Sequence, residues 1–289
     1  MLLGNPAVLR GHPLLPALLA AAVVLGILWA VLLWRRRGAK LRRSTLRAIG
    51  AWLGRAGVLV LVAMLVWLNP FAYQPPGTAG SGPSPSAKPS LSSVTDEPTA
   101  ITLTPEGRSA TTGLVFYPGA RVEARAYVDI LKLAADAGFL VVILKEPLNL
   151  SLLDGNQAGS AMAAHPEVTT WAVGGHSLGG VSASSFAKGN TEVAGLLLYA
   201  SYPLDSLRER AGLKVASISG TKDGLSTPAK VDASRALLPD DTTFVAVEGG
   251  NHAFFGNYGP QPGDGEPAVG RDVAQAEISR ATVQFLGQF

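Results

Sequence analysis

Two long stretches without a charged residue dominate the first quarter of this 289-residue chain, from Leu14 to Trp34 and from Ala56 to Tyr73. At about 1.5 Å per helical residue, each is long enough, or nearly so, to cross the roughly 30 Å hydrocarbon core of a bilayer. Trp67, Phe71 and Tyr73 close the second stretch, and aromatic residues favour the membrane interface. We therefore expect residues 1–73 to form an anchor of two transmembrane helices, at about 14–34 and 56–73.

The segment between these stretches carries only positive charges, on Arg35, Arg36, Arg37, Lys40, Arg42, Arg43 and Arg47, with Arg55 at the start of the second stretch. A short basic loop stays on the cytoplasmic side of a membrane. The N-terminus and everything after Tyr73 are then extracytoplasmic, in a multi-pass protein of the cell membrane. A signal peptide is the alternative for the first stretch, but a basic cluster follows it where a cleavage site of small residues belongs.

Composition changes sharply after the second apolar stretch. Residues 74–98 are dominated by Pro, Gly and Ser without a hydrophobic period, which indicates a flexible linker. Residues 99–289 carry 14 Lys/Arg against 19 Asp/Glu, and an acidic domain repels the phosphates of nucleic acids. The chain has no cysteine, which excludes disulfides, thiol catalysis and cysteine-bound zinc.

Residues 99–289 alternate short apolar runs with amphipathic patterns, which predicts an α/β domain with a mostly parallel sheet flanked by helices. Runs such as LVVIL are apolar on both faces, as in a strand that helices cover on both sides. Strands are expected near 113–117, 139–144, 170–173, 193–200, 215–219 and 244–247, with an edge strand near 101–103. Helices are expected near 122–137, 157–164, 178–188, 228–238 and 273–286.

The sequence Gly175-His176-Ser177-Leu178-Gly179 has the form G-x-S-x-G and lies between an expected strand and an expected helix. This is the place of a nucleophile elbow, the sharp turn that presents a reactive serine. Gly175 and Gly179 relieve the crowding around such a turn, and the N–H of Leu178 at the helix N-terminus can stabilise an oxyanion. A glycine-rich turn with an incidental serine is the alternative.

A serine nucleophile needs a base and an acid, which follow it in the order Ser, acid, His in proteins built around such an elbow. His252 is the one histidine after Ser177, since His12, His165 and His176 precede it. Asp223 follows an expected strand in the loop GTKDGL, at the sheet edge where such sites assemble. Asp205 is its rival. The other acids between Ser177 and His252 are Glu192, Glu209, Asp232, Asp240, Asp241 and Glu248.

A second oxyanion donor is expected in the loop after the 113–117 strand, where Gly119 permits close approach of a substrate and Ala120 offers its N–H. The short connection 201–213 cannot hold a large cap domain, so the pocket is expected to be shallow and open. Its lining is expected to include Leu148, Tyr202, Phe254, Phe255 and Tyr258, although each of these could equally pack in the core.

Five segments, FYPGARVEARAY, GFLVVILKEPLNL, GGHSLGG, SGTKDGL and GGNHAFFGNYGPQPGDG, resemble in order the α/β-hydrolase family related to dienelactone hydrolases. They are most similar to its bacterial membrane-anchored members, and the likeness covers about residues 100–289. The resemblance implies an α/β-hydrolase fold and hydrolase activity with Ser177, Asp223 and His252 as the triad. Dienelactone hydrolases use cysteine where this chain has Ser177, so the resemblance does not carry their substrate over.

Taken together, the sequence predicts a membrane-anchored serine hydrolase that cleaves small carboxylic esters through an acyl-enzyme, without metal or cofactor. Its expected partners are a small ester or acyl substrate and the lipid bilayer, and no nucleic acid. Two alternatives stay open. One is an acyltransferase that uses the same triad on an envelope acceptor, and the other is a non-catalytic binding module with a hydrolase-like fold.

Overall fold

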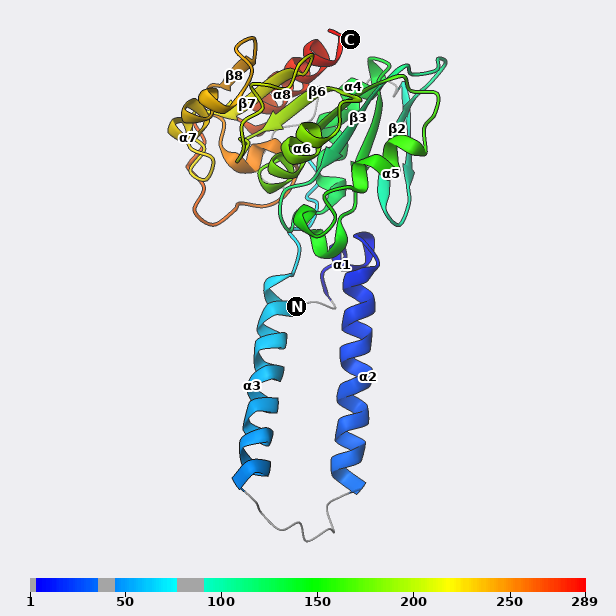
Figure 1. Ribbon diagram of the computed structural model, residues 1–289, viewed down its shortest axis with the longest axis vertical. Helices are drawn as coiled ribbons and strands as arrows, with labels where there is room; N and C mark the ends of the chain where they lie inside the picture. The colour runs from blue at the N-terminus through cyan, green and yellow to red at the C-terminus, as the bar shows by residue number, and fades with distance from the viewer. Residues whose placement is uncertain (1–3, 36–44, 77–90) are drawn as a thin grey trace.

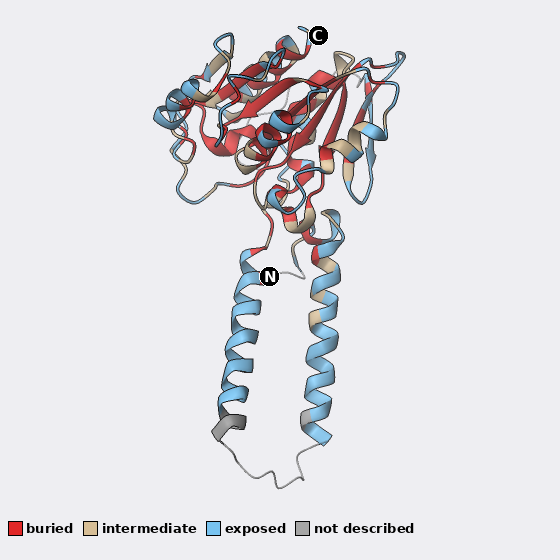
Figure 2. Ribbon diagram, in the orientation of Figure 1, coloured by how far each residue is buried: buried red, intermediate tan, exposed pale blue. Residues whose placement is uncertain are grey.

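Two long helices project from one end of an α/β domain in the computed structural model, which describes residues 4–35, 45–76 and 91–289 (Figure 1). A short helix α1 (Ala7–Arg10) precedes α2 (Leu14–Arg35), and α3 (Thr45–Trp67) leads toward the domain. Their segments Leu14–Leu32 and Ile49–Trp67 are long and apolar enough to cross a membrane. Their large apolar side chains are mostly exposed, in contrast to the buried interior of the domain (Figure 2).

Helix α3 differs from the expected second span at both ends. Its apolar segment starts at Ile49, before Arg55, whose guanidinium lies 5.4 Å from the centroid of the Trp52 ring in the same helix. It ends at Trp67, three residues before Pro70, which cannot continue a helix and restricts the residue before it. Phe71 and Tyr73 consequently lie outside the helix. Residues 36–44, which hold most of the predicted basic loop, lie outside the described residues.

The domain contains an eight-stranded sheet with the order β1-β2-β4-β3-β5-β6-β7-β8. Strands β3 to β8 are parallel, whereas β1 and β2 form an antiparallel edge. The prediction of a mostly parallel sheet is therefore confirmed. The strands are β1 (Ser92–Asp96), β2 (Ala100–Pro105), β3 (Thr112–Tyr117), β4 (Leu140–Leu144), β5 (Thr170–His176), β6 (Val193–Tyr199), β7 (Lys214–Gly220) and β8 (Thr243–Val247).

Strand β1 corrects the expected linker, because it occupies residues assigned to the linker 74–98. It pairs with β2 from Ser92 opposite Pro105 to Asp96 opposite Ile101. Its side chains are almost all exposed, so the apolar pattern that marks a buried strand is missing from its sequence. The domain thus begins by residue 92, and residues 77–90 lie outside the described part of the chain.

Helices cover both faces of the sheet, as predicted. Alternation along β3 divides the core, since Leu114 and Phe116 face one cluster and Val115 and Tyr117 the other. The first cluster includes α4 (Val128–Asp136) and α8 (Arg271–Leu286), and the second includes α5 (Gln157–Ala163) and α6 (Leu178–Gly189). A further helix, α7 (Pro228–Ala233), packs near β7, and short 3₁₀ turns are η2 (Ala124–Tyr127), η3 (Pro147–Asn149), η4 (Ser151–Leu153), η5 (Ser234–Leu237) and η6 (His252–Phe255).

Candidate active site

Ser177 occupies the turn between β5 and α6 in a backbone conformation that non-glycine residues rarely adopt, with φ 52° and ψ −121°. The turn is crowded. A Cβ on Gly175 would lie 2.4 Å from the carbonyl carbon of Gly179, and a Cβ on Gly179 would lie 2.2 Å from the carbonyl oxygen of Tyr117. Both positions therefore require glycine, and Ser177 is presented at the N-terminus of α6, where backbone N–H groups are free.

Backbone strain gathers at the edge of the sheet that holds Ser177. Within the described ranges, every non-glycine residue with positive φ follows the carboxyl end of a strand. Such conformations cost of order 1–3 kcal/mol each and cluster at functional sites. These residues are Arg121 after β3, Leu148 and Asn149 after β4, Ser177 after β5 and Ala200 after β6.

His252 and Asp223 form a buried pair at the same edge. The Nδ1 atom of His252 lies 2.8 Å from Oδ2 of Asp223, and neither side chain is exposed to solvent. The other carboxylate oxygen, Oδ1, accepts the N–H groups of Leu225 at 2.8 Å and Ser226 at 2.7 Å. Because an acceptor-only carboxylate faces Nδ1, this nitrogen carries a proton, and in the neutral ring Nε2 is then the acceptor. Nε2 has no hydrogen-bond partner among the described residues, Ser177 included.

Asp264 fixes the backbone of both loops, a role that the sequence analysis did not assign to it. Its carboxylate accepts the N–H of His252 at 3.0 Å, of Ala253 at 2.9 Å and of Gly224 at 3.2 Å. It therefore ties the histidine loop to the residue that follows Asp223. In the sequence GPQPGDG, an aspartate followed by glycine in a long irregular loop indicates a turn. The residues that Asp264 binds could not be read from it, because they lie in other segments of the chain.

His176, set aside in the sequence because it precedes Ser177, lies between the site loops. Its ring centroid is 4.5 Å from that of His252, and its Nδ1 is 2.8 Å from the hydroxyl of Tyr127. The same hydroxyl accepts the N–H of Gly119 at 2.9 Å, which leaves its O–H to donate to His176. Burial holds the pKa of His176 well below its usual value, so the ring is neutral.

The hydrogen bonds of Gly119, Tyr127 and His176 determine which backbone N–H groups remain available at the site. The N–H of Gly119 is occupied by Tyr127, so Gly119 shapes the loop and does not offer a donor. No partner within the described ranges accepts the N–H groups of Ala120 and Leu178, which stay available for an oxyanion. The hydroxyl of Ser201 donates to the carbonyl of Ser177 at 2.7 Å and supports the turn from the β6 side.

Most of the expected substrate-lining residues are not on a substrate surface. Phe255 and Tyr258 are fully buried, Phe254 is nearly so, and all three belong to the core cluster that packs against α8. Leu148 packs against a cluster formed with α1, α2 and α3. Their aromatic and apolar side chains fill the space beneath the loops, a role that a sequence alone does not distinguish from substrate contact. Tyr202 is only half-buried, directly after Ser201.

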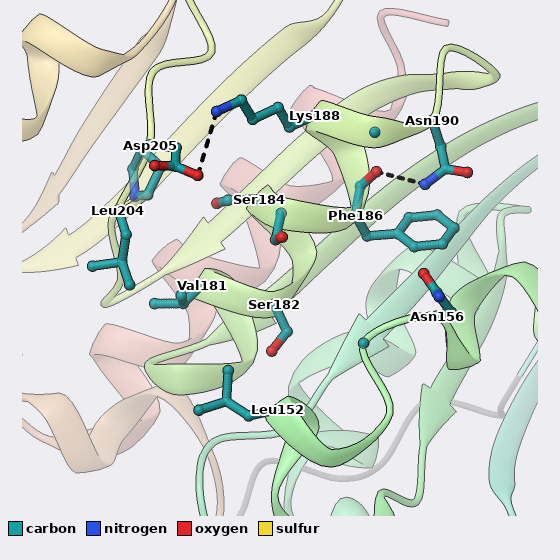
Figure 3. A pocket seen from close by; sticks show the side chains of 14 residues that line it. Leu152, Asn156, Val181, Ser182, Ser184, Phe186, Lys188, Asn190, Leu204 and Asp205 are labelled. Carbon is teal, nitrogen blue, oxygen red and sulfur yellow. Dashed lines mark hydrogen bonds and ion pairs between the residues drawn. The ribbon is translucent and has the colours of Figure 1, made fainter.

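A cavity of about 590 Å³ lies along α6, beginning at Val181, one helical turn after Ser177 (Figure 3). Leu152 and Leu204 flank it, and an ion pair of 3.3 Å joins Lys188 to Asp205 at its far end. This volume is within the range of small-molecule sites. Asp205, the rival acid, is therefore an exposed surface residue paired with a lysine. Among the described residues, no three His, Asp or Glu side chains gather as a metal site.

Glu146 is a second buried acid at this edge. It follows β4, is 2% exposed, and neither carboxylate oxygen has a hydrogen-bond partner within the described residues. Burial raises the pKa of Glu146 well above its usual value, because a charged carboxylate without partners is poorly solvated there. The folded protein therefore holds this side chain as the neutral acid.

Comparison with known proteins gives one family match. The model of the alpha/beta hydrolase family matches residues 113–276, more than half of the chain. No curated protein matches the chain in sequence. A solved dienelactone hydrolase-like promiscuous phosphotriesterase from metagenomic libraries is 19% identical, with a TM-score of 0.48 over 65% of this chain and 91% of that chain. An esterase domain from a Rhodothermus marinus protein is 12% identical, with a TM-score of 0.48 over 65% and 93%.

The buried acid generates a stability prediction. Unfolding exposes Glu146, which ionises above about pH 4.5, while the folded state keeps its proton. Ionisation of Glu146 in the unfolded state therefore lowers the free energy of unfolding progressively as the pH rises above this value, and has no effect below it. Glu146→Gln removes this dependence, so the variant should gain stability over the wild type as the pH rises above about 4.5, by up to about 1.4 kcal/mol per pH unit until the folded protein also loses the proton.

Urea unfolding of the full chain in detergent, across this pH range, measures the difference. Glu106→Gln is the control, because it makes the same change at an exposed glutamate. Parallel pH profiles for the wild type and Glu146→Gln would mean that Glu146 is solvated in the folded protein.

Proposed function

Because this chain belongs to the alpha/beta hydrolase family, we propose that it is a membrane-anchored serine hydrolase that cleaves carboxylic esters. The observation that carries the proposal is the buried His252–Asp223 pair, which leaves a bare Nε2 at the edge where the strained Ser177 is presented. Residues 1–73 are the anchor, and the hydrolase domain starts by residue 92. The positive-inside argument puts this domain on the extracytoplasmic side of the cell membrane.

In the first step, His252 Nε2 takes the proton of the Ser177 hydroxyl as its oxygen attacks the ester carbonyl. Asp223 keeps the imidazole in the tautomer with the proton on Nδ1 and stabilises the imidazolium that forms. The hydrogen bonds that Asp223 Oδ1 accepts from the N–H groups of Leu225 and Ser226 support this role, because they hold the carboxylate in its orientation toward His252. The proposed proton transfer requires the Ser177 hydroxyl to come within hydrogen-bond distance of Nε2, and such catalytic hydrogen bonds often tighten only when substrate is bound.

In the second step, the tetrahedral intermediate collapses to an acyl-enzyme. The N–H groups of Leu178 and Ala120 hold the oxyanion, a role supported by the fact that no described residue accepts either N–H. The Nε2–H of His252 then protonates the departing alkoxide. Water, deprotonated by His252 in turn, attacks the acyl carbonyl; the Nε2–H of His252 then returns the proton to the Ser177 oxygen as the carboxylic acid leaves. These steps use no metal and no cofactor.

Replacement of the nucleophile tests the proposal. Ser177→Ala should lower ester turnover by about a thousandfold or more and abolish labelling by a fluorophosphonate, because no other group can form the acyl-enzyme. The full chain in nanodiscs is assayed against a panel of short-chain esters. Ser160→Ala, an exposed serine of α5, is the matched control and should retain full activity.

The outcome also separates the alternatives. Absence of labelling at Ser177 in the wild type would leave a non-catalytic binding module as the better description. Labelling with acyl products that appear only when an alcohol acceptor is added would instead identify an acyltransferase. Unchanged turnover in Ser177→Ala would rule out the serine as nucleophile.

Tyr127→Phe tests the loop that carries Ala120. Loss of the hydroxyl removes the acceptor for the Gly119 N–H and the donor to His176, so the oxyanion loop loosens. We expect kcat to fall about tenfold with a smaller change in KM, because the lost positioning matters most in the transition state.

Tyr117→Phe is the matched control, since its buried hydroxyl binds Gly155 and Ala158 on the opposite face of the sheet. Equal losses of kcat in both variants would mean that the effect is a general loss of packing.

A further inference from the structure

The apolar helices are joined directly to the loops of the candidate active site. Phe71, four residues after the end of α3, donates its N–H to the Arg121 carbonyl at 2.6 Å, and its carbonyl accepts the N–H of Glu123 at 3.0 Å. The N–H of Tyr73 then binds the Glu123 carboxylate at 2.7 Å. Residues 69–74, which we call the strap, are thus fixed to the loop that begins with Gly119 and Ala120.

The strap also reaches the histidine loop. The N–H of Gln74 donates to the carbonyl of Asn257 at 2.9 Å, and the ring of Phe71 packs 6.0 Å from that of Tyr258. Arg121 closes the other end, because its guanidinium lies 5.1 Å from the centroid of the Trp67 ring and 4.9 Å from that of Phe71. After α3, the strap therefore contacts both the loop that follows β3 and the loop that carries His252.

Helix α2 makes the second attachment. Its residue Leu15 joins Val8, Leu65 and Leu68 in a buried cluster, against which Leu148 and Leu150 of the loop after β4 pack. Leu15 and Leu65 lie inside the apolar segments that are long enough to cross a membrane. In a bilayer crossed by α2 and α3, the loops that these residues contact lie at the depth of the lipid headgroups, which extend only about 6 Å beyond the hydrocarbon core on each side.

Because the carboxyl ends of parallel strands meet at one edge, these attachments turn the edge that carries Ser177 toward the bilayer. Figure 1 shows the loops after β3 and β4 beside α1 and the adjoining end of α2, with the C-terminus at the far side of the domain. Exposed apolar side chains lie on two short segments of this region, α1 and the turn η4 in the loop after β4. This apolar rim consists of Leu9, Leu152 and Leu153, which are 79%, 64% and 55% exposed.

We propose that the substrate is a lipid ester resident in the bilayer, whose acyl chain stays among the lipids while its ester group reaches Ser177 at the membrane surface. The apolar rim dips into the headgroup region and holds the catalytic edge against it. Contact with water is unfavourable for these large apolar side chains, and in this orientation lipid covers them instead. This inference rests on the proposed hydrolase function and adds the class of substrate and its side of approach.

The position of the rim is testable because the chain has no cysteine. A single Leu153→Cys variant of the full chain, labelled with an environment-sensitive dye and reconstituted in phosphatidylcholine vesicles, places a probe on the rim. Lipids with a spin-label quencher near the headgroup should quench this dye strongly. The control is Leu133→Cys, an exposed leucine of α4, whose dye should be quenched little. Equal quenching at both sites would overturn the orientation.

The substrate class is tested with two esters of the same fluorescent alcohol. Methylumbelliferyl butyrate is supplied in water, and methylumbelliferyl palmitate is dissolved in the vesicle bilayer. The wild type should cleave both, and the double variant Leu9→Ser, Leu153→Ser should cleave palmitate at least about fivefold more slowly with butyrate turnover within about twofold. The control pair is Leu133→Ser, Val273→Ser, two exposed apolar residues of α4 and α8, which should leave both rates unchanged.

The two proposals fail in different ways. Butyrate cleavage and fluorophosphonate labelling without cleavage of the bilayer ester would overturn the lipid substrate and leave the hydrolase intact. Equal losses on both esters in the rim variant would also overturn it. Absence of both labelling and butyrate cleavage would overturn the hydrolase function and the lipid substrate together.

Discussion

The proposed chemistry of this protein depends on the hydrogen bond between His252 Nδ1 and Asp223 Oδ2. It is fully buried, so solvent does not weaken it, and it fixes where the imidazole proton lies. The two residues come from different loops, which the Asp264 carboxylate holds together through three backbone N–H groups. The Asp264 carboxylate thus holds together two loops whose hydrogen-bonded residues are 29 positions apart in the sequence.

A second constraint, steric crowding, acts on the turn that carries Ser177. The turn around the serine is crowded enough that only glycine fits at positions 175 and 179, and Ser177 itself bears the strain of a positive φ. Tyr127 and His176 use their polar atoms to set the neighbouring loop, which leaves the Ala120 N–H free. Among the described residues, the Ala120 and Leu178 N–H groups and the His252 Nε2 have no hydrogen-bond partner, and they belong to loops at the sheet edge that carries Ser177.

Local sequence patterns were sufficient for the parallel strands and most helices, because buried strands such as Leu140–Leu144 are apolar throughout and their flanking helices have a period near 3.6. Strand β1 escaped prediction because its exposed residues carry no such pattern, and its order comes from pairing with β2. The G-x-S-x-G motif and the order of the chain singled out Ser177, Asp223 and His252 as candidates. The hydrogen bonds of Asp264 and Tyr127 and the burial of Glu146 depend on contacts between segments that are distant in the sequence. Phe255 and Tyr258 were expected to line a pocket but lie in the core, because aromatic residues of a core and of a pocket cannot be told apart in a sequence.

The most direct test of the account is a structure of the full chain after reaction with a fluorophosphonate, which mimics the tetrahedral intermediate. We predict a phosphorus bonded to the Ser177 Oγ, with a phosphonyl oxygen about 3 Å from the N–H groups of Leu178 and Ala120 and His252 Nε2 facing the serine oxygen. A phosphonyl oxygen that points to solvent, or a His252 ring that faces away from the adduct, would contradict the proposed catalyst.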